Sequence, residues 1–208
     1  MFKLKDWIDQ DKIYWTQLSV NPSALTVLEK NQDKIDWYWL SGNPSALTLL
    51  EQNQDKIDWS QLSLNPSAIT LFENNQDKIN WSQLSENPAA WAISLLEKNQ
   101  DKINWYWLSY NPSAIALLEK NQDKIDWTRL SGNPSAIALL ENNQDKICWS
   151  QLSSNTSARA IALLEKNQDK IDWKQLSANP SARAIALLEN NQDNINWFWL
   201  SKNPAIIE

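Results

Sequence analysis

One pattern of apolar and polar positions recurs along the whole chain about every 22 residues. A tryptophan is followed three positions later by leucine, then by Ser-x-Asn-Pro, and then by a short apolar run that ends in Leu-Glu. A fixed period of this length indicates a repeat architecture. The tryptophans that mark the copies are spaced by 22 residues five times and by 24 residues three times: Trp15, Trp37, Trp59, Trp81, Trp105, Trp127, Trp149, Trp173 and Trp197.

We therefore divide the chain into an N-terminal cap segment, 1–8, and one repeat domain, 9–208. No shift of composition and no linker interrupts the array. The boundaries of repeats 1 to 9, in chain order, are 9–30, 31–52, 53–74, 75–98, 99–120, 121–142, 143–166, 167–190 and 191–208.

Each repeat is predicted to contain two short helices. In repeat 2, Asn43 followed by Pro44 is typical of a helix start, because proline lacks the N–H that would be unpaired there. All eight prolines of the chain occupy this one position of the repeat. The helix is expected to end at Asn53, in a left-handed conformation. Asp55 is expected to cap the other helix, and Asp58 is expected to lie in its first turn.

Such short helices cannot be stable alone, because isolated helices below about 12 residues are marginal in water. Their stability must come from stacking on neighbouring repeats, as it does in solenoids. The fold predicted is therefore all-α, an α-solenoid of nine two-helix repeats of 22–24 residues.

The periodicity of the first helix separates a buried from an exposed face. At 100° per residue, Trp37 and Leu40 lie on one side, and Tyr38, Trp39 and Gly42 lie on the other. The tryptophan and leucine positions are the same in all nine repeats, whereas the other three vary freely. The nine tryptophans named above are thus predicted to form the structural core between repeats.

Two further sets of apolar positions complete the expected core. Ala46, Leu47, Leu49 and Leu50 cover more than half of the second helix and are predicted to be buried. Ile35 is isoleucine in every repeat, yet it falls on the variable side of the wheel. Either the regular helix begins at or after it, or it packs against the neighbouring repeat.

Aromatic residues gather at the variable positions of repeats 2, 5 and 9. Exposed tryptophan, tyrosine and arginine are the residues that protein interfaces favour. The residues predicted to bind a partner are Tyr38, Trp39, Tyr106, Trp107, Tyr110, Arg129, Phe198 and Trp199.

The three 24-residue repeats carry their extra residues just after the Asn-Pro position. The added pairs are Trp91-Ala92, Arg159-Ala160 and Arg183-Ala184. An insertion in mid-helix would rotate the helix cap by about 200°. Insertion in the first turn keeps the register of the apolar run, so we expect a local change of curvature at these repeats. Trp91 could be a core filler or an exposed ring.

Polar residues that recur in nearly every repeat are interpreted as structural. An active site is single and asymmetric, whereas Asp33, Ser41, Asn43 and Glu51 have counterparts all along the chain. Ladders of helix caps and hydrogen bonds between repeats explain them. Lys34 and its counterparts are expected to form exposed ion pairs with carboxylates of adjacent repeats, worth under about 1 kcal/mol each.

Composition narrows the function classes further. The 208 residues include 14 Trp but no His, which excludes His-dependent catalytic triads and most zinc sites. A net charge of −6 with only three arginines offers no basic stripe for phosphates, so nucleic-acid binding is disfavoured. Cys148, the single cysteine, replaces the usual Asp or Asn and is interpreted as a surface substitution. We expect no enzymatic activity, no cofactor and no metal.

The chain shows no apolar run near the length needed to span a bilayer and no signal-peptide pattern in its first residues. No membrane association and an intracellular location are expected. A single cysteine also fits a reducing compartment.

The frame DKI-x-W-x-x-LS-x-NP-x-AI-x-LLE resembles the short repeats encoded in many copies by large DNA viruses of amoebae and algae, the mimivirus and chlorovirus relatives. More weakly, the chain is similar to the leucine-rich repeat variant, whose units carry Asn-Pro and alternate α-helices with shorter 3₁₀-like helices. The viral resemblance implies a repeat array in the host cytoplasm or the virion, and no particular activity. The residues that carry it in repeat 5 are Asp101–Ile103, Trp105, Leu108, Ser109, Asn111, Pro112, Ala114, Ile115 and Leu117–Glu119.

Three functions remain. The first is a scaffold that binds a protein partner through the variable positions. The second is a structural or virion component that self-associates, with the short last repeat exposing an apolar edge. The third is glycan binding by the spaced aromatic rings.

Overall fold

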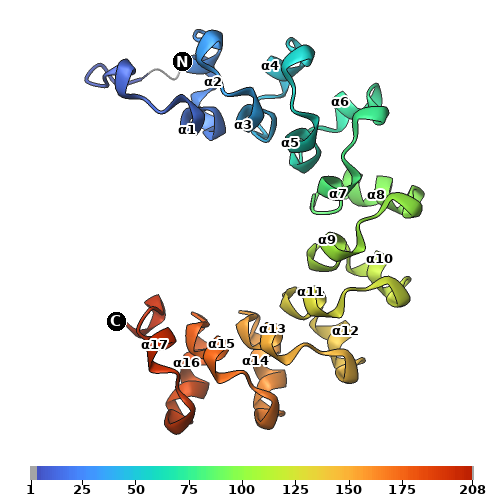
Figure 1. The fold of residues 1–208 in the computed structure, drawn as a ribbon, viewed down its shortest axis with the longest axis vertical. Helices are drawn as coiled ribbons and strands as arrows, with labels where there is room; N and C mark the ends of the chain where they lie inside the picture. Colours follow the sequence, from blue (N-terminus) through green and yellow to red (C-terminus); the bar gives the residue numbers. More distant parts are fainter. Residues whose placement is uncertain (1–3, 208) are drawn as a thin grey trace. The chain divides into compact units, whose positions relative to one another are not determined.

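The computed structural model describes residues 4–207, and these residues contain 17 α-helices, 11 short 3₁₀ helices and no strand (Figure 1). The contacts between residues divide the chain into two compact halves, Met1–Asn104 and Trp105–Glu208. In each half, short helices alternate in a regular repeating order and pack against their neighbours, which confirms the α-solenoid. No helix in this part of the chain is long and apolar enough to cross a membrane. Residues 1–3 of the predicted cap segment lie outside the described residues.

The first helix of each repeat begins at the repeated tryptophan. These helices pack in sequence, α1 to α7 in the N-terminal half and α9 to α17 in the C-terminal half, so they form one layer within each half. Their bounds are α1 Trp15–Val20, α3 Trp37–Ser41, α5 Trp59–Leu64, α7 Trp81–Leu84, α9 Trp105–Tyr110, α11 Trp127–Gly132, α13 Trp149–Ser154, α15 Trp173–Ala178 and α17 Trp197–Leu200.

The second helices carry the even numbers. In the C-terminal half, α14 packs against both α12 and α16. Their bounds are α2 Leu25–Leu28, α4 Leu47–Glu51, α6 Ile69–Glu73, α8 Ala90–Lys98, α10 Ile115–Glu119, α12 Ile137–Glu141, α14 Ala158–Glu165 and α16 Ala182–Glu189.

A 3₁₀ helix over Gln-Asp-Lys precedes each first helix, and the two-helix prediction did not include it. Two further 3₁₀ helices, η2 Pro22–Ala24 and η11 Pro204–Ile206, begin at the Asn-Pro position. The Gln-Asp-Lys helices are η1 Gln10–Lys12, η3 Gln32–Lys34, η4 Gln54–Lys56, η5 Gln76–Lys78, η6 Gln100–Lys102, η7 Gln122–Lys124, η8 Gln144–Lys146 and η9 Gln168–Lys170, with η10 Gln192–Asn194 in the last repeat.

Two predictions for the entry into the first helix were wrong. Asn53 is not left-handed: its φ and ψ are −134° and 49°, and its side-chain amide donates to the Leu49 carbonyl at 2.9 Å. Asp55 lies inside η4 and caps nothing, whereas the Asp58 carboxylate accepts from the Gln61 N–H at 2.8 Å. The reason is that the 3₁₀ helix and an extended residue separate the second helix of one repeat from the first helix of the next.

That extended residue is the invariant isoleucine. Ile35 has φ −67° and ψ 131°, so it precedes the regular helix, which begins at Trp37. Its side chain is nevertheless buried. The first of the two explanations offered for Ile35, a helix that starts after it, is thereby confirmed.

The Asn-Pro position behaves differently in short and long repeats. In repeat 2 the Asn43 side chain accepts from the Ser45 N–H at 3.1 Å, as a cap does, but α4 begins only at Leu47. An i→i+3 hydrogen bond from the Ala46 N–H to the Asn43 carbonyl closes a turn first, so the predicted helix start is wrong by one turn. In the long repeats this turn is absent, and the added residues extend the helices that begin at Ala90, Ala158 and Ala182.

The core lies between the two helix layers. Leu40, Ala46 and Leu50 are completely buried and Leu49 nearly so, as predicted, while Leu47 is half-buried. Because the same positions are buried in the neighbouring repeats, the repeats within one half complete one another's apolar core.

Candidate binding surface

A ladder of hydrogen bonds between repeats uses the polar positions that never change. In repeat 2, the Ser41 hydroxyl donates to the Trp37 carbonyl at 2.7 Å and accepts from the Asp58 N–H at 3.0 Å. The Asn65 amide donates to the carbonyls of Ser41 and Asn43 at 3.1 and 3.0 Å. No buried side-chain polar atom in the described part of the chain lacks a partner. The structural role predicted for Ser41 and Asn43 is confirmed, whereas Asp33 lies exposed inside η3 and takes no part in this ladder.

A second ladder consists of lysine ammonium groups over tryptophan rings. The Lys56 Nζ lies 4.7 Å from the centroid of the Trp37 ring in the preceding repeat. The ion pairs predicted between these lysines and carboxylates of adjacent repeats were therefore wrong. In seven repeats the 3₁₀ helix turns the lysine onto a ring, which is worth about 0.5–1 kcal/mol at an exposed site, and Lys12 pairs with Asp9 of its own repeat at 3.4 Å. The other lysine–tryptophan pairs are Lys34–Trp15, Lys78–Trp59, Lys102–Trp81, Lys124–Trp105, Lys146–Trp127 and Lys170–Trp149.

This ladder also corrects the predicted core. Eight of the nine repeated tryptophans are half-buried, not buried, and Trp197 is 63% exposed. Their rings cover the edge of the junction between repeats and keep one face toward the lysine and the solvent. Repeat 9 carries Asn194 at the lysine position, so the ring of Trp173 has no such lysine above it.

The first candidate site is a pair of exposed rings on α3, Tyr38 and Trp39. The Asp36 carboxylate caps this helix by accepting from the Trp39 N–H at 3.4 Å. The rings are 46% and 42% exposed and meet edge to face, with centroids 5.1 Å apart. From the next repeat, the Gln61 amide donates to the Tyr38 hydroxyl at 2.6 Å. The aromatic pair thus stays open to solvent beside a neutral neighbour.

The second candidate site lies on α9 and α11. Tyr106 and Trp107 form the same edge-to-face pair, with centroids 4.9 Å apart. The guanidinium carbon of Arg129 lies 4.0 Å from the Tyr106 centroid and 4.8 Å from that of Trp107, and the guanidinium donates to the Tyr106 hydroxyl. Tyr110 is exposed and passes close to Gly132, where a Cβ would lie 3.3 Å from the ring. The structure therefore brings Tyr106, Trp107 and Arg129 into contact and places Tyr110 on the same helix, beside Gly132.

The third candidate site is on α17. Phe198 and Trp199 meet edge to face with centroids 5.5 Å apart, and Phe198 is largely exposed. The Lys202 Nζ lies 4.1 Å from the Phe198 centroid and 5.0 Å from that of Trp199. The Lys174 Nζ of the preceding repeat lies 5.4 Å from the Trp199 centroid. Each predicted aromatic pair is thus a real contact with its own polar neighbours.

Two ion pairs outside these clusters involve the arginines inserted in the long repeats. The Arg183 guanidinium binds both carboxylate oxygens of Glu165, at 2.9 and 2.5 Å. This hydrogen bonding lowers the pKa of Glu165 below its ordinary value of 4.5 and raises the pKa of Arg183. Arg159 also pairs with Glu141, through one hydrogen bond of 2.7 Å. Sequence reasoning missed both pairs, although the recurrence of arginine at the insertion was a signal for them.

The structure also shows the surroundings of Trp91 and Cys148. Trp91 is half-buried and its ring packs against Phe72, with centroids 6.0 Å apart and planes 33° apart. Trp91 is therefore neither a fully buried core filler nor a freely exposed ring: it covers Phe72 and keeps part of its own surface exposed. Cys148 occupies the N-cap position of α13, is half-buried and makes no side-chain cap hydrogen bond. Residues 4–207 contain no group of three or more His, Cys, Asp or Glu that could hold a metal ion.

The chain was also compared with protein-family models, curated proteins and solved structures, and none of them matches it. The three aromatic clusters and their neighbours in adjacent repeats are therefore the basis for a functional proposal.

Proposed function

We propose that the protein is a non-enzymatic repeat scaffold that binds a protein partner through the variable side chains of its first helices. One observation carries this proposal. The constant serines and asparagines are used in a ladder between repeats, whereas three repeats place paired rings, at least one of each pair exposed, where the other repeats have mostly Gln, Ser or Thr. Such rings do not stabilise the core and cost solvation, so a ligand that covers them would gain apolar burial.

The clusters have the chemistry of interface anchors. Tyrosine and tryptophan offer large contact areas with little conformational entropy to lose, and arginine adds a planar group that stacks and donates hydrogen bonds. Arg129 and Lys202 stand beside rings in two clusters, so a partner with acidic and apolar side chains would complement them.

The test is capture of the partner by the triple variant Trp39→Ala, Trp107→Ala and Trp199→Ala. Immobilised wild type and variant are exposed to an extract of cells that make the protein, and bound proteins are quantified by mass spectrometry. We expect specific capture to fall at least tenfold while the melting temperature changes little.

The chain itself offers a matched control. Gln17, Gln83 and Gln175 occupy the same position of the first helix in other repeats. The triple variant of these residues to alanine should retain full capture. Equal capture by wild type and the tryptophan variant, or a collapse of its melting temperature, would contradict the proposal.

One observation favours glycan binding as a second candidate. A pocket of about 380 Å³ is lined by Tyr106, Asp126, Thr128, Arg129 and Gln151, which combines an aromatic ring with the carboxylate, amide and hydroxyl groups that sugars require. Titration of a glycan panel, followed by NMR of the labelled chain, tests it. Saturable shifts confined to these residues would support it, and unchanged spectra across the panel would dispose of it.

A further inference from the structure

The inserted residue of each long repeat occupies one place, beside the glutamate that ends the second helix of the preceding repeat. At two of the three places this residue is arginine, and it forms an ion pair with that glutamate: Arg159 with Glu141, and Arg183 with Glu165. The Arg183 pair is bidentate, the geometry in which a guanidinium and a carboxylate bind best.

The third place differs, because repeat 4 carries Trp91 where the others carry arginine. The equivalent glutamate is Glu73 at the end of α6, and within residues 4–207 its carboxylate has no hydrogen-bonded or ionic partner. The Trp91 indole N–H donates to the Pro66 carbonyl at 2.8 Å, which fixes the ring beside α6. A carboxylate that is paired twice elsewhere in the chain is thus left open here.

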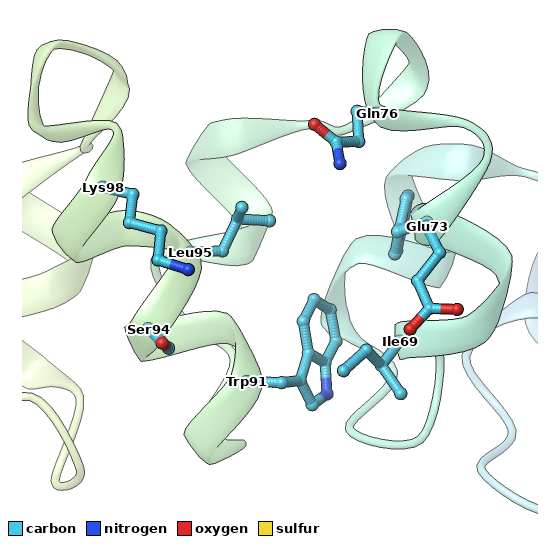
Figure 2. Close-up of a pocket in the computed structure, with 8 residues that line it drawn as sticks. Ile69, Glu73, Gln76, Trp91, Ser94, Leu95 and Lys98 are labelled. Atoms are coloured by element: carbon cyan, nitrogen blue, oxygen red, sulfur yellow. The ribbon is translucent and has the colours of Figure 1, made fainter.

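A pocket of about 220 Å³ lies at this place, lined by residues of α6, α8 and η5 (Figure 2). Figure 2 shows the Glu73 carboxylate on one side of the Trp91 indole and the Lys98 ammonium on the other. Ile69, Phe72 and Leu95 provide apolar walls, and Gln76 lies at the rim. The pocket therefore combines an aromatic face with a carboxylate.

We propose that this pocket binds an arginine side chain of a protein or peptide partner. Its guanidinium would pair with Glu73, as Arg159 and Arg183 pair with Glu141 and Glu165, and would stack on the Trp91 indole. The chain already places cations over tryptophan rings at seven junctions between repeats, and Arg129 covers two rings in repeat 5. The charge and shape of the pocket thus fit a group that the protein itself supplies at the equivalent places.

Lysine fits this pocket less well than arginine. An ammonium cannot form two parallel hydrogen bonds to one carboxylate, and it offers no plane to stack on the indole. The Lys98 ammonium repels any cation in the pocket and so limits the affinity for arginine. Removing this charge by Lys98→Gln should strengthen arginine binding severalfold.

The probe is N-acetyl-arginine amide, titrated into the ¹⁵N-labelled full chain and followed by NMR. We expect a saturable shift of the Trp91 indole N–H and of the amides around Glu73. N-acetyl-citrulline amide has nearly the same shape without the charge and should bind at least tenfold more weakly; the lysine amide should be weaker severalfold. Equal binding of the arginine and citrulline amides, or of the arginine and lysine amides, would overturn the proposal.

Glu73→Gln should reduce arginine binding at least tenfold. Glu51→Gln is the matched control, because Glu51 occupies the same position one repeat earlier and already accepts a hydrogen bond from Thr70 at 3.3 Å. Undiminished binding by the Glu73 variant would overturn the proposal. The proposal would also be overturned if N-acetyl-leucine amide bound as tightly as the arginine amide, because the pocket would then be specific for aliphatic side chains.

Trp91→Arg supplies the guanidinium from the chain itself, in the arrangement that repeats 7 and 8 already use. The variant should fold, keep its melting temperature and no longer bind the arginine amide, as read from the Leu95 backbone amide. Arginine-amide binding as strong as that of the wild type would count against the proposal. If the Trp91→Arg variant does not fold, the Glu73→Gln variant still tests the proposal. The site is on second helices, so its failure would leave the proposed role of the first-helix clusters standing.

Discussion

Repeats 2 and 5 begin their first helices with the same five residues, Trp-Tyr-Trp-Leu-Ser, at positions 37–41 and 105–109. Both form an edge-to-face pair of the second and third residues, and both bury the leucine completely. The difference comes from the next repeat. The Gln61 amide donates a hydrogen bond to the Tyr38 hydroxyl, whereas Arg129 lies over the rings of both Tyr106 and Trp107.

A surface site of this array belongs to two repeats at once. The pentapeptide sets the positions of the rings, and one side chain of the following repeat sets what lies beside them: the two tyrosines are almost equally exposed, at 46% and 44%, and the tryptophans differ. Trp39 is accordingly exposed, while its counterpart Trp107 is half-buried. Identical segments thus offer different surfaces, which is how a repetitive sequence can carry distinct sites.

The largest expected effect concerns what the two segments share. Leu40→Ala and Leu108→Ala should each destabilise the protein by about 2–5 kcal/mol, because both side chains are completely buried. Urea unfolding followed by circular dichroism measures the loss. The two losses should agree closely, and a strongly unequal pair would show that the two repeats are not equivalent scaffolds.

A smaller effect should separate the two tryptophans. Trp107→Ala removes a ring that contacts Arg129, so it should cost about 1 kcal/mol more stability than Trp39→Ala. The same urea titrations provide the measurement. An equal or larger cost for Trp39→Ala would mean that the guanidinium contributes nothing to the packing of its cluster.

Exchanging the neighbours should exchange the exposure of the rings. Arg129→Gln should uncover Tyr106 and Trp107, and Gln61→Arg should cover Tyr38 and Trp39, with stability changes below about 1 kcal/mol. Broadening of the Trp39 and Trp107 indole resonances by a soluble paramagnetic probe reports this exposure. Unchanged broadening in both variants would contradict control by the neighbouring repeat.

The smallest effect distinguishes an arginine on rings from an arginine on a carboxylate. Glu165 has a lowered pKa in the folded protein, so its pair with Arg183 stabilises the fold above the ordinary pKa of 4.5 and is lost as pH falls through the folded value. The stability difference between wild type and Arg183→Gln should therefore shrink below that pH. The stability difference between wild type and Arg129→Gln should stay the same over this pH range, because Arg129 packs on aromatic rings and not on a carboxylate. Thermal melts from pH 3 to pH 7 measure both.

Much of the fold follows from the sequence because two independent signals agree. The helical period places Leu40 inside and Tyr38 and Trp39 outside, and the comparison among repeats gives the same division. Local polar chemistry was also readable where it depends on near neighbours, as in the cap that Asn43 provides to Ser45.

Other features could not be derived, because they depend on how one repeat approaches the next. The position of Lys56 over Trp37 requires the 3₁₀ helix and the extended isoleucine, neither of which has a periodic signature. Similarly, the contact of Arg129 with Tyr106 joins residues 23 positions apart. The half-burial of the tryptophans follows from these contacts and not from their invariance.

Partner capture by Gln61→Arg, which alters no aromatic residue, tests whether the ring faces of repeat 2 form the binding surface. If the open faces of Tyr38 and Trp39 bind the partner, a guanidinium laid over them should weaken capture severalfold while the melting temperature stays the same or rises. Capture equal to that of the wild type, in a variant whose rings are shown by NMR to be covered, would contradict the central claim that these ring faces form the binding surface.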